Sequence, residues 1–471
     1  METLTTEAAL PDDVLAAVLR RLPARGLAAS RRVCRAWRDL VDDRRLLLPY
    51  LLPHSVRGFF VNYVDHGRPH FFARPSSPAT AAGGAQIIDG EFDYVQAAAG
   101  HPRFGWFKVA DHCNGLVVYR DEYHDDEQLM YACSPATRRW ARLPPLAAGD
   151  MWRRRAFAVF DPAASPHYEV LVAPVEPEKK NLLGGRCAAA MPVAGIAETD
   201  EGACRAMEWP PAATWTWYAF SSRTGRWRER AFLREGEAAG IVGDLMMDSL
   251  PYDPRPRWRY AAYWQGALYV HCRGEYVSRL SLTDDTYRVI KSPIDRAECY
   301  NRDVWSFLGR LEKGVHFVAI HRRRLRVWIL DEQHSRSEWI LKHDNVLTPD
   351  DWWAVVDGDY HQILKDGPWI LDDYYDNKSK EKANKFEWSS DDDDIIDTAE
   401  GNNEAEYVYP HTFQVLGFHP YKEVIFLTTA QVAVAYHLNS SKVQFLGIMK
   451  PSDWNQGVYD SFVYTPCLRS A

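Results

Sequence analysis

Apolar residues near the amino end recur at helical spacing. One set follows the intervals i, i+1, i+4, i+5 and i+8, and comprises Val14, Leu15, Val18, Leu19 and Leu22. This spacing predicts a helix with one apolar face. Pro11 and two acids, Asp12 and Asp13, suit its first turn, and Pro23 stops it.

A second helical pattern follows at i, i+4, i+7 and i+8, formed by Val33, Trp37, Leu40 and Val41. The first fifty residues therefore predict a small group of two or three helices. A unit of roughly 45 residues buries too little of its own surface to be very stable alone. We expect it to present apolar side chains to a partner.

The pattern then changes to strands. The stretches Tyr131 to Trp140 and Tyr218 to Trp227 share a hairpin pattern in which tyrosine precedes tryptophan by nine residues. Looser copies of this strand, polar turn and strand occur at residues 277–287, 327–339 and 434–443. Such repetition at intervals along a chain is typical of an array of similar units.

A different hairpin precedes four of these copies, at residues 160–172, 263–270, 307–318 and 418–427. Two hairpins in series make a four-stranded antiparallel unit, and repeated units of this kind predict a β-propeller. Five units are visible, and we expect about six blades. The first unit, around residues 115–140, shows no clear partner strand. We expect residues 461–465 to supply it and close the ring; a two-sheet sandwich is the competing architecture.

Composition supports a sheet protein. The 471 residues are 46% hydrophobic and include 18 Trp and 24 Tyr. Two insertions interrupt the repeat, at 176–214 and 372–406. The second contains Asp391 to Asp394 and is predicted to be a solvated loop, with contact to a basic substrate as its functional alternative.

Charge and cysteine usage exclude several classes. The formal charge of −8 arises largely from the acidic stretch, and no basic domain indicates nucleic-acid binding. The eight cysteines show no zinc or disulfide spacing, and the run from Leu46 to Leu52 is too short to cross a bilayer. We expect a cytoplasmic or nuclear protein that does not enter a membrane, with Asn377 and Asn439 unglycosylated.

The amino-terminal motif resembles the F-box. The matching stretches are Leu10-Pro11-Asp12-Asp13-Val14-Leu15, Leu22-Pro23 and Val33-Cys34-Arg35-Ala36-Trp37-Arg38-Asp39-Leu40. The resemblance implies binding to a Skp-type adaptor, and through it to a cullin RING ligase. It implies this adaptor-binding role for Leu10, Pro11, Val14, Leu15, Leu19, Leu22, Pro23, Val33, Cys34, Trp37 and Leu40. The usual Ser-Asp-Pro-x-Phe ending is replaced by residues 41–46, which leaves the end of the last helix open.

These helices have two other interpretations. They are predicted either to cap the β domain or, because of their arginines, to form a DNA-binding helix-turn-helix. Nearby acids, among them Asp39, Asp42 and Asp43, offset the arginines and oppose the second interpretation.

The remaining chain resembles a kelch-like propeller. Thr137-Arg-Arg-Trp140 followed by Leu143-Pro144 is similar to kelch repeats, although the kelch double glycine is absent. Residues 104–468 are similar to the F-box-associated propeller of large plant F-box families. The predicted domains are a helical domain at 1–53, a connecting segment at 54–103 and a propeller at 104–471.

No well-marked catalytic motif is present, including the Walker loop, the dinucleotide glycine fingerprint, H-E-x-x-H and G-x-S-x-G. His66 and His70 are a candidate metal pair, but Gly67 and Pro69 disfavour the helix that this spacing needs. Asp111-His112-Cys113 suggests a cysteine nucleophile, but neighbours on a strand point to opposite faces.

We therefore expect no catalytic residue, metal or cofactor. Two function classes remain: a non-catalytic ubiquitin-ligase subunit that binds a protein substrate, and a propeller enzyme or carbohydrate-binding protein with capping helices. Adaptor binding distinguishes them. The substrate itself is not encoded in the loop composition.

Overall fold

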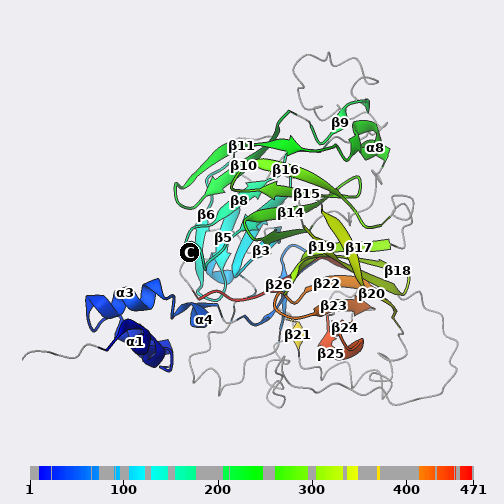
Figure 1. The fold of residues 1–471 in the computed structure, drawn as a ribbon. Coiled ribbons are helices and arrows are strands. Elements are labelled where there is room, and N and C mark those ends of the chain that lie inside the picture. The colour runs from blue at the N-terminus through cyan, green and yellow to red at the C-terminus, as the bar shows by residue number, and fades with distance from the viewer. Residues whose placement is uncertain are drawn as a thin grey trace, which may run out of the picture.

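A computed structural model shows a small helical unit joined to a large β domain (Figure 1). The structure describes residues 10–22, 24–52, 54–64, 66–73, 88, 90, 92–95, 106–121, 129–146, 154–176, 205–211, 213–247, 260–294, 304–332, 337–347, 369–371, 413–429, 432–449, 451 and 457–468. The helical unit contains α1 (Asp12–Leu19), α2 (Ala24–Ser30), α3 (Arg35–Asp43) and α4 (Leu48–Leu51). The predicted fold class, helices followed by a β-rich propeller, is confirmed.

Six four-stranded antiparallel units form the β domain, and we call them blades 1 to 6. The first three follow the chain. Blade 1 contains β3 (Phe107–Cys113), β4 (Leu116–Asp121), β5 (Met130–Ser134) and β6 (Arg139–Arg142). Blade 2 contains β7 (Ala156–Val159), β8 (Glu169–Val172), β10 (Trp215–Ser221) and β11 (Arg226–Glu235). Blade 3 contains β13 (Ala261–Trp264), β14 (Ala267–Cys272), β15 (Tyr276–Ser281) and β16 (Thr286–Lys291).

Blades 4 and 5 also follow the chain, whereas blade 6 combines distant segments. Blade 4 contains β17 (Val304–Leu311), β18 (Gly314–His321), β19 (Arg324–Asp331) and β20 (Glu338–Val346). Blade 5 contains β22 (Gln414–Phe418), β23 (Val424–Thr429), β24 (Val432–His437) and β25 (Lys442–Ile448). Blade 6 contains β26 (Val458–Tyr464), β1 (Gly58–Tyr63), β2 (His70–Ala73) and β21 (Ile370–Leu371).

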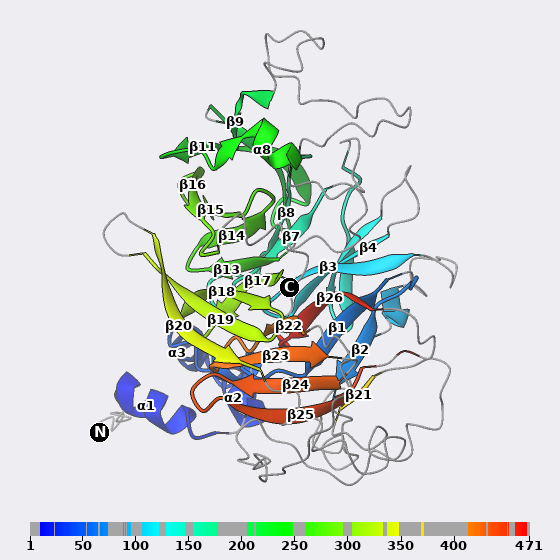
Figure 2. The ribbon, with the colours of Figure 1, turned by 90° about the vertical axis from the view of Figure 1, so that its right-hand side faces the viewer.

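The blades form a ring, because a separate apolar cluster fills each of the six interfaces between neighbours. The last interface joins blade 6 to blade 1, where Phe60 and Tyr464 pack with Phe107 and Tyr119. Figure 2 shows the sheets arranged around a centre at which β3, β17, β22 and β26 come together. Blades 2 and 3 are further joined by parallel pairing of their outer strands, β11 and β16. The arrangement is not a two-sheet sandwich.

The ring closes differently from the prediction. Strand β26 pairs with β1, with Gly58 opposite Tyr464 and Ser461 opposite Val61. Blade 1 already has an innermost strand, β3, so residues 461–465 do not complete it. Residues 54–103, expected to be a connecting segment, instead supply β1 and β2 to the sixth blade.

The two insertions are described only in part. The end of the first contains β9 (Glu208–Trp209), which pairs with β12 (Gly240–Ile241) beside the short helix α8 (Val242–Met247). Residues 177–204 of that insertion and all of 372–406, including the acidic stretch, lie outside the described residues.

Candidate functional site

The amino-terminal helices have a small core of their own. It consists of Ala16, Leu19, Leu27, Val41 and Leu46. Leu19 is only 1% exposed, so it holds the helices together and does not reach the surface. Burying one leucine of this kind contributes about 1.5–3 kcal/mol.

Another set of apolar residues, two on α1 and one just before it, faces outward. Leu10, Val14 and Val18 follow the intervals i, i+4 and i+8, and their exposed fractions are 56%, 47% and 50%. We call these three residues the α1 stripe. Val33, in the turn before α3, is a further exposed apolar residue at 64%. Clustered exposed apolar side chains of this kind mark surfaces that bind other proteins.

The eleven residues that the F-box resemblance singles out fall into different environments. The structure leaves Leu10, Pro11, Val14, Val33 and Cys34 exposed. It half-buries Leu15, Leu22, Trp37 and Leu40 against the helical core. Leu19 is inside that core, and Pro23 lies outside the described residues. Val18 is exposed but is not among the predicted site residues. Its spacing of four residues from Val14 is the sequence signal that places it on the same face of the helix.

Ion pairs join the ends of the helices. Arg44, just after α3, pairs with Asp13 at the start of α1 at 2.7 Å, and Arg31 pairs with Asp42 at the same distance. These groups are largely exposed, so each pair contributes about 0–1 kcal/mol. The Arg44–Asp13 pair joins the end of α3 to the start of α1, and the Arg31–Asp42 pair joins the turn after α2 to α3.

One contact joins α4 to the other helices, and a second joins the segment after α4 to the propeller. The hydroxyl of Tyr50 in α4 donates to the carbonyl oxygen of Leu22 at 3.1 Å. Further along, the His54 ring stacks on Tyr421 of blade 5, with centroids 4.5 Å apart. In Figure 1, α4 lies between the other helices and the strands. The helical unit is therefore held by side-chain contacts as well as by the chain.

The Asp111-His112-Cys113 segment lies at the centre of the ring, but its side chains point to different neighbours. Cys113 donates to the carbonyl of Phe160 at 3.4 Å, whereas Nε2 of His112 accepts from the Gly115 amide at 3.0 Å. Burial raises the pKa of the Cys113 thiol to about 12 and lowers the pKa of His112 to about 3. The thiol is therefore protonated and the imidazole neutral near pH 7, which does not suit a cysteine nucleophile.

His66 and His70 are neighbours, with Nδ1 of the first 2.9 Å from Nε2 of the second. Within the described part of the chain, no cluster of three or more His, Cys, Asp or Glu side chains suits a metal ion. In the same residues, no helix combines the length and apolar character needed to cross a bilayer.

Comparison with known proteins identifies the helical unit. Residues 8–47 match the F-box-like family model. The chain carries an F-box-like domain. This domain contains α1, α2 and α3 and the α1 stripe.

The relatives are F-box proteins of Arabidopsis thaliana. An F-box/kelch-repeat protein is 27% identical over 31% of this chain and 32% of its own length. A putative F-box protein is 24% identical over 35% of this chain and 39% of its own length. Another putative F-box protein is 24% identical over 29% of this chain and 43% of its own length. The chain thus spans between 32% and 43% of the length of these relatives. A crystal structure of a Lactobacillus plantarum protein covers 88% of this chain and 97% of its own, at 10% identity and a TM-score of 0.32.

Proposed function

We propose that this protein is the substrate-recognition subunit of a Skp/cullin/F-box ubiquitin ligase. The F-box-like domain docks a Skp-type adaptor through the α1 stripe and Val33, and the propeller binds the protein to be ubiquitinated. The protein is a non-catalytic receptor that acts in the cytoplasm or nucleus. The observation that carries the proposal is an exposed apolar stripe on a helical unit that matches the F-box-like family.

Burial decides which predicted residues serve as contacts. A side chain reaches a partner only if it is accessible; Val14 and Val18 are accessible along α1, and Leu10 is accessible just before the helix begins. Burial of each methylene group in an interface contributes about 0.8 kcal/mol. Leu19 acts indirectly, because it keeps α1 packed on α3. The half-buried Leu15 and Trp37 support the α1 stripe, and the parts of their side chains that remain exposed extend the contact surface at its edge.

The attached propeller fits the receptor role. A ring of six blades offers a rigid support for loops, and loops on rigid supports carry most protein recognition. The His54–Tyr421 stack ties the F-box-like domain to blade 5, so a substrate held by the ring is kept at a defined position relative to the adaptor.

The test is adaptor affinity in the full chain. Replacing Val14 and Val18 together with alanine removes exposed methyl groups without touching the helical core. We expect the double variant to lose about 2 kcal/mol of binding free energy, which weakens adaptor binding roughly thirtyfold. Calorimetry with a purified Skp-type adaptor resolves this change.

The matched control is Leu341→Ala with Val346→Ala. These residues lie on β20 and are 48% and 57% exposed, so the control removes apolar surface of similar accessibility far from α1. The control should bind the adaptor as the wild type does. Absence of adaptor binding by the wild type at micromolar concentration, or equal weakening by both double variants, would contradict the proposal.

A further inference from the structure

A cavity of about 120 Å³ lies on the axis of the ring. The innermost strands of blades 1, 3, 4, 5 and 6 line it. Part of its wall is aromatic: Tyr260 packs on Phe307 with centroids 3.8 Å apart, and Phe307 packs on Phe418 at 5.3 Å. One water needs about 10–15 Å³ of such volume, so the cavity has room for roughly eight to twelve waters, or one aromatic ring with a small substituent.

Among the described residues that line the cavity, Arg310 is the one cationic side chain, and Asp111 is also part of the lining. Its guanidinium carbon lies 5.6 Å from the ring centroid of Trp264 and 5.9 Å from that of Tyr421. Its Nη2 donates to Oδ1 of Asn114 at 3.5 Å, which orients the guanidinium group. Among the described residues, no carboxylate lies within 4.0 Å of Arg310.

Some other arginines of the ring contact a carboxylate, whereas the buried Arg273 donates to the carbonyl oxygen of Leu245. Three with partly or fully buried side chains are each paired with a carboxylate: Arg155 with Glu176 at 3.1 Å, Arg230 with Asp285 at 2.6 Å, and Arg279 with Glu332 at 2.9 Å. Taking a charge out of water is costly unless an opposite charge compensates it. Arg310 has ring faces and a neutral amide where these three have an anion.

The nearest acids on neighbouring strands are already engaged. Oδ2 of Asp111 accepts from the Ala158 amide at 2.8 Å, and Oδ1 of Asp161 accepts from the Ala163 amide at 2.9 Å. Both acids are thus held by backbone groups of blade 2. Arg310, which is half-buried, therefore has no ion-pair partner among the described residues, and a bound carboxylate would supply one.

We propose that the axial cavity binds a carboxylate attached to a small apolar body. The carboxylate pairs with Arg310, and the apolar body packs against Tyr260, Phe307 and Phe418. A planar guanidinium group matches a carboxylate through two parallel hydrogen bonds. A single cation among aromatic walls suits a monoanion with an apolar part better than a fully hydrated dianion. The site belongs to the ring and does not depend on adaptor binding.

The probe is benzoate, and binding to the full chain is measured by ligand-observed NMR. The wild type should bind benzoate saturably and bind benzyl alcohol, a neutral molecule of the same shape, at least tenfold more weakly. Arg310→Met keeps the length of the side chain but removes its charge, and should weaken benzoate binding at least tenfold. Tenfold corresponds to about 1.4 kcal/mol.

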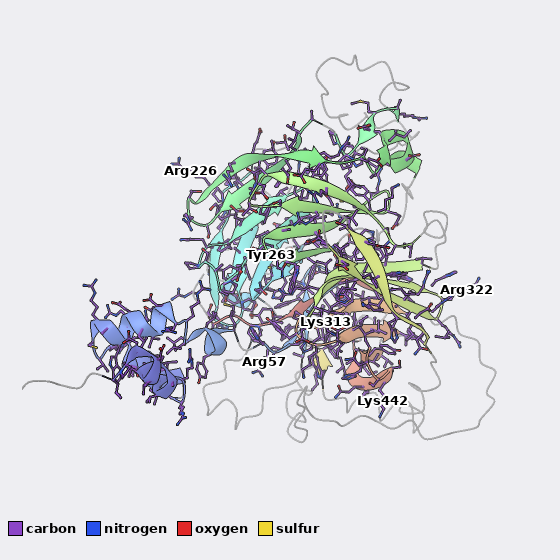
Figure 3. All side chains as sticks on the ribbon, viewed as in Figure 1. Arg57, Arg226, Tyr263, Lys313, Arg322 and Lys442 are labelled. Carbon is purple, nitrogen blue, oxygen red and sulfur yellow. The ribbon has the colours of Figure 1, made fainter. Side chains whose placement is uncertain are left out.

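The matched control is Arg226→Met, which removes an exposed arginine at the edge of the β domain, away from the central Tyr263 (Figure 3). It should leave benzoate binding unchanged. The thermal midpoint of each variant shows whether it is folded, and the comparison of benzoate with benzyl alcohol needs no variant.

A blocked peptide with one glutamate identifies the source of the carboxylate. Competition with benzoate assigns the site to an acidic side chain of a bound protein, and no competition assigns it to a free organic acid. The proposal is overturned if the wild type does not bind benzoate, if benzyl alcohol binds equally well, or if folded Arg310→Met binds benzoate as the wild type does. None of these results bears on adaptor affinity, so this proposal and the proposed function fail separately.

Discussion

Phe60 of β1 lies directly opposite Phe462 of β26 in an antiparallel pair that joins the beginning of the β domain to its end. Phe60 also makes an edge contact with Tyr464, with ring centroids 5.2 Å apart. The hydroxyl of Tyr464 accepts from the Ala136 amide of blade 1 at 3.0 Å. This group of aromatic residues therefore fastens blade 6 internally and to its neighbour.

Deleting residues 458–471 should destabilise the whole ring. The deletion removes β26, leaves β1 without its partner and opens the aromatic cluster between blades 6 and 1. A strand edge opened in this way is prone to pair with other chains. We expect a lower midpoint in thermal unfolding followed by circular dichroism. Removal of 469–471 alone is the control, and an unchanged midpoint after the longer deletion would exclude closure by β26.

Leu19→Ala should unfold the F-box-like domain, whereas Val18→Ala should not. Leu19 is 1% exposed and Val18 is 50% exposed, although they are adjacent in α1. Truncating a buried leucine costs about 2–5 kcal/mol. Loss of helical signal and of adaptor binding should occur together in Leu19→Ala, while the propeller stays folded. Equal helical content in the two variants would show that Leu19 is not a core residue.

Asp111→Asn should change the pH dependence of stability. Burial raises the pKa of Asp111 from 3.8 to about 7. Between these values the unfolded chain has released a proton that the folded chain retains, so Asp111 makes stability fall as pH rises. His112 acts in the opposite sense, because burial lowers its pKa from 6.5 to about 3 and stability then rises with pH over that range.

In the wild type, the titrations of Asp111 and His112 change stability with pH in opposite directions. The Asp111→Asn variant removes the first titration and keeps the second. Asparagine can still accept from the Ala158 amide but carries no charge. Relative to the wild type, Asp111→Asn should be about equally stable at pH 4 and more stable by an amount on the order of 4 kcal/mol at pH 7. Urea unfolding across this pH range measures the difference. A difference that does not vary with pH would show that Asp111 titrates normally.

Gly309→Ala should destabilise the contact between blades 4 and 5. A Cβ atom at position 309 would lie 2.2 Å from Cδ2 of Phe418, a separation that the side chains must relieve by moving. Overpacking of this kind typically costs about 1–3 kcal/mol. Unfolding by urea should show the loss. A wild-type free energy of unfolding would mean that Phe418 has room to shift.

The repeated hairpins were predictable because their turns and aromatic spacing are local. Tyr131 and Trp140 occupy β5 and β6, and Tyr218 and Trp227 occupy β10 and β11, as the repeat indicates. Strand β1 was missed because all six of its residues are buried, so Gly58–Tyr63 shows no alternation, and its partner lies at the other end of the chain. In β3, burial alternates along the strand, although its pairing with β4 shifts register between Val109 and Asp111.

The proposed adaptor surface was only partly predictable for a related reason. An apolar set that includes both i and i+1 positions covers more than one side of a helix, and spacing does not say which side faces inward. The packing of α1 on α3 decides it: Leu19 turns into the core and Val18 turns outward. The environment of Arg310 was not predictable, because Asn114, Trp264 and Tyr421 come from three other blades or turns.

Pairing between β1 and β26 also determines when blade 6 can form during synthesis. Strand β1 begins at Gly58 and β26 begins at Val458, so 400 residues separate their first positions. At about 5–20 residues per second, a ribosome needs roughly 20–80 s to add them. Throughout that interval the apolar segment Gly58–Tyr63 has left the ribosome without its closing partner. During synthesis, the unpaired edge of β1 must therefore avoid pairing with other polypeptides until β26 has left the ribosome.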